Sequence, residues 1–467
     1  MHTHTPREIL TDLWLRAGGE PAELAAAKLT GEEPLLPSSF RLAAAAQTSI
    51  AASGLAAADI WRARSGEGQE VAVDMCHAVV ECRSERYLRV DGKPPPPAWD
   101  PTAGIYRTGD GRFVRLHTNF PHHRAAVCKV LNCAEERDAI QAALNKWEGE
   151  AFETAAYAGG AVVAMMRSHQ EWCAHPQAKA LAELPPFTIE KIGEAPPKPW
   201  PAGDRPLAGL RVLDLSRVIA GPVAGRTLAA HGADVMLISS PALPSIPWLV
   251  IDTGRGKLSS FVELKDPAGR AALRGLLAEA DIFSQGYRPR ALGALGLSPE
   301  EAAEINPGIV YVSLSAYGHV GPWADRRGFD SLVQTATGFN HAEGQAAEID
   351  GPKELPAQML DHATGYLMAF AAMIAKERQA REGGSWLVRV SLAQTGRWLW
   401  NLGRIPHGLE TADLQAEAVL PFIEEHPSGF GSLRGVAHAA KLSRTPALWA
   451  RPAMPLGSHK AEWPVRG

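Results

Sequence analysis

Short apolar runs alternate with helical segments through the second half of the chain. Runs typical of buried strands lie at 210–215, 234–239, 281–284 and 309–314. Helices are predicted between them at 223–230 and 267–279. Strands that alternate with helices indicate βαβ units, and so a parallel, doubly wound sheet with a ligand crevice at the carboxyl ends of its strands. We predict an α/β fold whose Rossmann-like sheet comes mainly from residues 206 to about 395.

The first half of the chain has a more helical pattern. Helices are expected at 42–64, 135–145 and 150–158, and a strand at 70–75. Residues 104–116 have the pattern of a β-hairpin, with Gly109-Asp110-Gly111 at its turn. We predict a smaller α+β unit between about 85 and 190.

A proline-rich segment separates the two halves. It runs from 194 to 205, and it cannot form a helix or an inner strand because proline lacks the backbone donor. We therefore divide the chain into a first part, 1–193, a linker, 194–205, and a second part, 206–467.

The two parts share a local pattern. A helix, a glycine-rich turn at Gly66 and a strand resemble a helix, a turn at Gly383 and a strand that follow 317 positions later. We interpret this as a partial duplication. The alternative is chance, because helix, turn and strand form a common unit.

Composition narrows the class of protein. The chain of 467 residues is 46% hydrophobic and 21% charged with a net charge of -4, which gives no basic field for nucleic acid. No apolar run reaches the roughly 18 residues of a membrane span, and the first residues do not resemble a secretory signal. Five cysteines without a CxxC pair indicate reduced thiols. We expect a cytoplasmic protein that binds neither nucleic acid nor membrane.

Several spaced motifs of the second part occur in the order of one protein family. They lie at 206–226, 228–235, 265–270, 287–289, 306–313 and 318–322. Together they resemble the class III coenzyme A (CoA) transferases, the CaiB/BaiF family. Segments 106–111 and 171–177 resemble that family's smaller domain, which normally follows the nucleotide-fold segment. The chain therefore looks like a rearranged, partly duplicated member, and the resemblance implies a homodimer, possibly an interlocked one.

The resemblance implies a nucleophile at Asp361. The segment 356–365 matches the family's catalytic aspartate, at the start of a helix expected from 361 to about 378. A carboxylate can form a mixed anhydride with an acyl group and expel CoA thiolate. From spacing alone, Asp361 reads as a plain helix N-cap. The position 317 earlier is Ala44, so one active carboxylate per chain is expected.

The same resemblance implies contacts to CoA. The expected cofactor-binding residues are Arg217, Val218, Ile219, Lys257, Gly286 and Tyr287. Lys257 belongs to a basic turn that in the family lies near the CoA phosphates, whereas Gly286 stands where the family has a CoA-contacting asparagine. Phe329 replaces the histidine of related racemases, which argues against a racemase.

Two further groups are given structural interpretations. Asp330 is expected to be structural. His117, His122 and His123 could suggest a metal site, but no carboxylate or cysteine lies close in sequence, so we expect solvated loop histidines.

These observations predict a function. We expect transfer of CoA from an acyl-CoA donor to a small free carboxylic acid, with no permanently bound cofactor and no metal. Two alternatives stay open: another CoA-thioester enzyme, such as a racemase, isomerase or lyase, or a degenerate CoA-binding subunit without catalysis.

Overall fold

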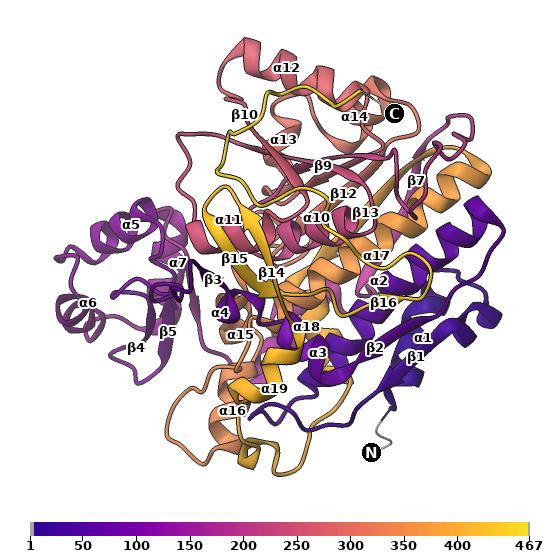
Figure 1. The fold of residues 1–467 in the computed structure, drawn as a ribbon. Coiled ribbons are helices and arrows are strands. Elements are labelled where there is room, and N and C mark those ends of the chain that lie inside the picture. Colours follow the sequence, from indigo (N-terminus) through magenta and orange to yellow (C-terminus); the bar gives the residue numbers. More distant parts are fainter. Residues whose placement is uncertain (1–3, 466–467) are drawn as a thin grey trace.

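A seven-stranded sheet forms the centre of the molecule (Figure 1). The computed structural model describes residues 4–465, the side chain of Pro289 excepted. The strands of this sheet are β7 (Phe187–Gly193), β8 (Arg211–Leu215), β9 (Asp234–Ser239), β10 (Lys257–Phe261), β11 (Ile282–Gln285), β12 (Val310–Ser315) and β13 (Ser385–Ser391). They lie in the order β10-β9-β8-β11-β12-β13-β7, and all neighbours are parallel except β13 and β7. The predicted parallel, doubly wound sheet is confirmed.

The order of the strands creates a switch point. From β8, the chain builds outward through β9 and β10 and then returns to the other side of β8 with β11, β12 and β13. In such sheets, the crevice for a ligand opens where the direction reverses, at the carboxyl ends of the two central strands. Here these strands are β8 and β11, which are paired in parallel.

Helices cover both faces of the sheet because successive strand residues point to opposite sides. Val212 and Val235 pack into one core with α10 (Ala220–Ala230) and α17 (Met359–Glu382). Leu213 and Met236 pack into a second core with α12 (Pro267–Ala278), α13 (Pro289–Gly293) and α14 (Pro299–Ile305). The strands are thus buried on both sides, as their continuous apolar runs predict.

The first part of the chain adds a second helix and a small sheet beside α17. Helix α2 (Leu42–Ser65) packs against α17, and β2 (Val71–Asp74) lies between β1 (Ala27–Thr30), which is parallel to it, and β16 (Lys441–Leu442), which is antiparallel. Likewise, β13 lies between parallel β12 and antiparallel β7. Helix α3 (Met75–Glu81) follows β2 as α18 (Leu392–Asn401) follows β13. Starts of α2 and α17, and of α3 and α18, are 317 positions apart, the offset of the sequence repeat.

A separate small unit lies beside the large sheet (Figure 1). Its antiparallel sheet consists of β4 (Gly104–Arg107), β5 (Phe113–Leu116) and β6 (Val163–Met165), and the predicted hairpin is formed by β4 and β5. Helices α5 (Pro121–Leu131), α6 (Arg137–Leu144) and α7 (Gly149–Ala158) pack on this sheet around their own core.

The remaining elements are short. They are α1 (Pro6–Arg16), η1 (Pro21–Ala26), α4 (Ser84–Tyr87), β3 (Arg89–Val90), α8 (His169–Ala174), α9 (Pro176–Leu181), α11 (Pro247–Thr253), α15 (Asp330–Ala336), α16 (Phe339–Ala346), η2 (Gly408–Glu410), α19 (Ala416–Val419), η3 (Leu420–Phe422), β14 (Ile423–Ser428) and β15 (Gly431–Val436). Within residues 4–465, no helix is both long enough and apolar enough to cross a membrane.

The large sheet differs from its prediction at both edges, because neither β10 nor β7 is predicted as one of its strands. Strand β7 comes from the first part of the chain, before the proline-rich segment, yet it pairs with β13. Its polar residues, such as Thr188 and Glu190, alternate with apolar ones because an edge strand is half exposed. For this reason β7 lacks the continuous apolar run that identified the inner strands.

Candidate active site

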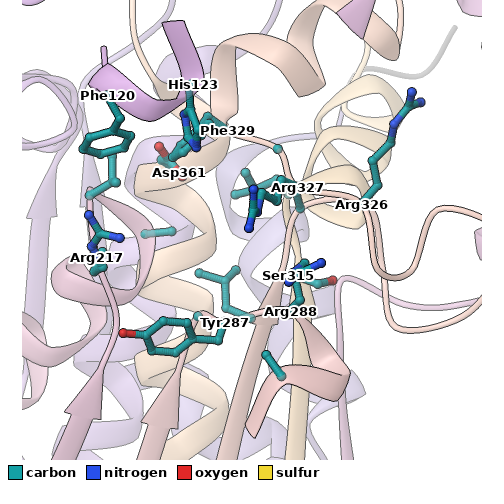
Figure 2. Close-up of a pocket in the computed structure, with 18 of the residues that line it drawn as sticks. Phe120, His123, Arg217, Tyr287, Arg288, Ser315, Arg326, Arg327, Phe329 and Asp361 are labelled. Carbon is teal, nitrogen blue, oxygen red and sulfur yellow. The ribbon is translucent and has the colours of Figure 1, made fainter. Parts of the chain in front are cut away.

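A cavity of about 300 Å³ opens at the switch point of the large sheet (Figure 2). One wall is the sheet edge, formed by the residues that follow β8, β11 and β12. A second wall is the segment 324–329, and Asp361 at the start of α17 forms part of a third. The small unit closes the cavity with Phe120, His122 and His123. Both parts of the chain therefore contribute to one cavity.

The turn after β8 brings Arg217 and Val218 to this cavity. Val218 has a φ of 74°, the left-handed region that a β-branched residue rarely adopts, at a cost of about 1–3 kcal/mol. The guanidinium of Arg217 donates a hydrogen bond to the Pro244 carbonyl and lies 5.2 Å from the centre of the Phe120 ring. Through Arg217, the strained turn thus contacts both the loop after β9 and the small unit.

Asp361 lies in the first turn of α17, where the helix touches α10. A side chain at Gly365, one turn later, would come within 2.5 Å of the Ala220 carbonyl, so only glycine permits this close approach. Asp361 is 7% exposed and its carboxylate lies at the cavity (Figure 2). Helix α17 begins at Met359, two residues earlier than expected, and its N-cap is Gln358. Asp361 is therefore not the N-cap, and the plain capping interpretation is wrong.

A second carboxylate holds the backbone of Asp361. Asp330 Oδ2 accepts the Asp361 N–H at 2.8 Å, while its other oxygen accepts from the Gln334 amide. Asp330 is thus in direct contact with the residue predicted as nucleophile. Among the described residues, by contrast, no group donates a hydrogen bond to the Asp361 carboxylate, which leaves both of its oxygens available to a ligand.

The surroundings of Asp361 disfavour its charge. Burial raises the pKa of Asp361 well above its usual range, and the neighbouring carboxylates of Asp330 and Glu85 raise it further. Burial also raises the pKa of Asp330, to about 6, although the Asp361 N–H opposes this. Glu85 differs: burial alone would raise its pKa, but a 3.1 Å contact with His362 Nε2 brings it below its usual range. Asp361 therefore sits in a desolvated, anionic neighbourhood.

Cationic side chains form much of the remaining wall. Arg217, Arg288, Arg326 and Arg327 all line the cavity, whereas Asp361 is the single acidic residue among the described residues that line it. Arg326 is buried, 3.6 Å from the Glu153 carboxylate and 4.0 Å from the centre of the Trp323 ring, so it is part of the wall. Such a cavity favours anionic ligands. No cluster of three metal-ligating side chains occurs in the part of the chain that the structure describes.

The structure brings most of the predicted CoA-binding residues together. Arg217, Val218, Gly286 and Tyr287 line the cavity with Asp361. Ile219 is buried at the start of α10 and does not line it.

Lys257 lies away from the cavity, contrary to the expected place in a basic turn. It begins strand β10, and its ammonium group donates to Asp214 at 3.0 Å and to the Pro222 carbonyl at 2.8 Å. The side chain is buried beneath α10, where the absence of a side chain at Gly225 makes room for it. Lys257 lies here and not at the cavity because a buried ammonium group needs a counter-charge, which Asp214 supplies.

Two of the three histidines in 117–123 are not solvated loop residues, contrary to the prediction. His117 and His123 are only 3% and 4% exposed, and His122 and His123 belong to α5. The ring of His117 stacks on Phe329 with 3.8 Å between centres and 10° between planes. Their aromatic neighbours explain the burial. No local pattern predicts this burial, because Phe329 lies more than 200 positions away in the sequence.

Comparisons with known proteins identify the family of this chain. The sequence profile described as CoA-transferase family III matches residues 22–184 and 207–418. The acetyl-coenzyme A transferase nodX of Hypoxylon pulicicidum is 30% identical over 63% of this chain and 54% of that protein. Human succinyl-CoA:glutarate CoA-transferase is 35% identical over 37% of this chain and 41% of that protein.

A solved structure, that of Rv3272 from M. tuberculosis, matches with 29% identity over 42% of this chain and 58% of that one, with a TM-score of 0.39. The chain thus spans about half the length of these relatives. The family profile covers well over half of this chain and includes the segments that form the cavity. The chain therefore belongs to CoA-transferase family III.

Proposed function

We propose that this chain transfers CoA from an acyl-CoA to a free carboxylic acid, with Asp361 as the nucleophile. The observation that carries the proposal is the position of Asp361: within residues 4–465, it is the single acidic side chain of a cationic cavity at the switch point of the sheet. Its carboxylate is nine-tenths buried and accepts no hydrogen bond from the described residues. When ionised, a poorly solvated carboxylate is a stronger nucleophile than one in water.

The proposed reaction has two halves. An Asp361 oxygen attacks the thioester carbon, the C–S bond breaks, and CoA leaves as a thiolate. The acyl group stays on Asp361 as a mixed anhydride. The thiolate then attacks the Asp361 carbonyl carbon, which releases the first acid as a carboxylate and leaves an aspartyl-CoA thioester. The acceptor carboxylate then attacks the carbonyl carbon of the aspartyl-CoA thioester, which releases CoA thiolate and forms a second mixed anhydride. The thiolate attacks the acceptor's carbonyl carbon in this anhydride, which gives the new acyl-CoA and frees the Asp361 carboxylate.

The other lining residues suit the proposed substrates. The guanidinium groups of Arg217, Arg288 and Arg327 would attract the CoA phosphates and the carboxylate of the acid. Tyr287 would form an apolar side of the nucleotide site, and the Gly286 backbone lies next to it. CoA enters and leaves as a substrate. The proposed mechanism uses no permanently bound cofactor.

The small unit supports a further part of the proposal. Phe120 and His123 come from the first part of the chain and close the cavity of the second part. We propose that the rearranged order of segments lets one chain supply both walls of its own site. The homodimer implied by the family stays a prediction.

The test compares Asp361→Asn with Asp350→Asn, a 93% exposed surface control. Each protein is incubated with a panel of acyl-CoAs and free acids, and the products are identified by mass spectrometry. We expect exchange by the parent and the control and none by Asp361→Asn, because an amide cannot form the anhydride. Binding of CoA by the parent without any turnover would support the degenerate subunit instead.

A further inference from the structure

We propose that His123 of the small unit donates a hydrogen bond to the acyl carbonyl oxygen while Asp361 attacks the neighbouring carbon. The proposal rests on the proposed nucleophilic role of Asp361 and assigns a catalytic residue to the wall that faces it.

The position of His123 is the first observation. It lies in the first turn of α5, where the small unit meets the large sheet, and it lines the same cavity as Asp361. Figure 2 shows His123, Phe329 and Asp361 among the side chains that line this cavity. A carbonyl group that Asp361 attacks would therefore lie in the cavity that His123 lines.

Packing fixes the ring at this position. Its centre lies 5.4 Å from that of Phe120 and 5.9 Å from that of Phe329. Phe329 is followed by Asp330, which accepts the backbone N–H of Asp361. Phe329 therefore packs on His123, and the next residue in the chain binds the backbone of Asp361. The proposed donor and the proposed nucleophile are thus held by adjacent residues.

The ionisation of His123 suits a hydrogen-bond donor. Burial, and to a smaller extent the nearby His117, His122, Arg327 and Arg217, together lower the pKa of His123 to about 3. The ring is therefore neutral at physiological pH and carries one N–H and one lone pair. Nδ1 is buried without a hydrogen-bond partner among the described residues. If the proton is on Nε2, the lone pair of Nδ1 faces the buried aromatic side chains. The Nε2–H group can then donate to a ligand in the cavity.

The chemistry of the step calls for such a donor. Carboxylate attack on a thioester transfers no proton, so a base is not needed, but negative charge develops on the carbonyl oxygen. The cationic residues of the cavity serve the phosphates and the carboxylates of the substrates. A neutral N–H held at the reacting carbon would stabilise the oxyanion without binding Asp361 as an ion pair, which would weaken the nucleophile.

The experiment measures how fast Asp361 is acylated in a single turnover. Acyl-CoA is mixed with the enzyme and quenched with hydroxylamine, and the hydroxamate at residue 361 is quantified by mass spectrometry. CoA affinity and thermal unfolding are measured on the same proteins. The variants are His123→Ala, which removes the donor, and His123→Gln, whose amide keeps one. Lys129→Ala, an exposed change on the same helix, is the control.

We expect His123→Ala to slow acylation by about 10²-fold, the typical effect of one oxyanion donor, with CoA affinity changed by less than about threefold. His123→Gln should recover part of the loss, and Lys129→Ala should match the parent. Acylation by His123→Ala at the parental rate would overturn the proposal, and so would equal losses in both His123 variants with a parallel loss of CoA affinity. A parent enzyme that forms no hydroxamate at residue 361 would instead overturn the proposed function, and this inference with it.

Discussion

Helices α2 and α17, which we interpret as copies of one element, have different surroundings. Each has 24 residues, their starts are 317 positions apart, and they pack against each other. In both, the third residue donates its backbone N–H to a carboxylate: Asp361 to Asp330, and Ala44 to Glu33 at 2.9 Å. Yet Asp361 faces a cavity, whereas Ala44 is completely buried.

The difference arises from what surrounds each helix. Six of the seven strands of the large sheet precede α17, and the switch point between β8 and β11 forms the cavity. The first copy has only the strands β1, β2 and β16 and therefore no switch point within the described residues. Glu33 is moreover paired with Arg41 at 2.7 Å. A helix whose third residue binds a carboxylate is therefore not enough to form a site. The cavity also needs the carboxyl ends of strands in a doubly wound sheet.

The first copy supports the second instead. Glu85, on α4, contacts His362, the residue next to Asp361. Ser84 donates a hydrogen bond to Asp252, whose carboxylate also binds Arg226 at 2.7 Å and Arg255 at 2.9 Å. All of these last four residues are buried. The two parts of the chain are thus joined by a charged network under the site.

The largest predicted effect is a loss of stability when this network is broken. Asp252→Asn removes the close counter-charge of Arg255 and leaves Arg226 with only Glu81, 3.9 Å away. We expect a loss of about 3–5 kcal/mol in the free energy of unfolding at pH 7. Burial alone would raise the pKa of Asp252, but Arg226 and Arg255 outweigh it and bring the pKa below its usual value. Its contribution is therefore present above the unfolded pKa, about 4, and is lost as the pH falls further.

Denaturant unfolding at several pH values checks this prediction. The difference between the parent and Asp252→Asn should narrow below about pH 4. Asp350→Asn, on the exposed surface, should match the parent throughout. A loss of less than about 1 kcal/mol at pH 7 would show that the network does not join the two parts.

A smaller effect is expected from Asp330, whose carboxylate accepts the Asp361 backbone N–H. The proposed exchange requires ionised Asp361, whose pKa is raised first by burial and then by Asp330. Asp330→Asn removes that charge but keeps an oxygen for the Asp361 N–H. The acid limb of the exchange rate should therefore move to lower pH by about one unit, or about 1.4 kcal/mol.

The matched control is Glu33→Gln, which makes the same change under Ala44. It should leave the pH profile of exchange unchanged, because no nucleophile lies above it. Equal profiles for Asp330→Asn and the parent would contradict the electrostatic account of Asp361.

The smallest effect on exchange is expected from restoring the carboxylate in the first copy. Ala44→Asp places an acid where no cavity reaches, and burial beside Glu33 would keep it neutral. The rate per folded molecule should equal that of the parent, with no hydroxamate at residue 44 after hydroxylamine treatment. Trapping at residue 44 would show that the first copy has a working site of its own.

The sequence predicts the parts of this molecule that local pattern determines. Continuous apolar runs identify β8, β9, β11 and β12, because parallel strands are buried on both faces. Motif resemblance places Arg217 and Tyr287 with Asp361, and the structure brings them to one cavity. The partner of Lys257, by contrast, is Asp214, 43 positions away. Likewise, His123 becomes a cavity residue because the small unit folds over the large sheet, which no local pattern encodes.

The central claim is that Asp361 becomes covalently activated during exchange. The most direct measurement treats the intact chain with acyl-CoA and hydroxylamine, without acceptor acid, and maps the hydroxamate by peptide mass spectrometry. The account predicts a hydroxamate at residue 361 in the parent and none in Asp361→Asn. A hydroxamate on another carboxylate, or normal exchange by Asp361→Asn, would contradict it.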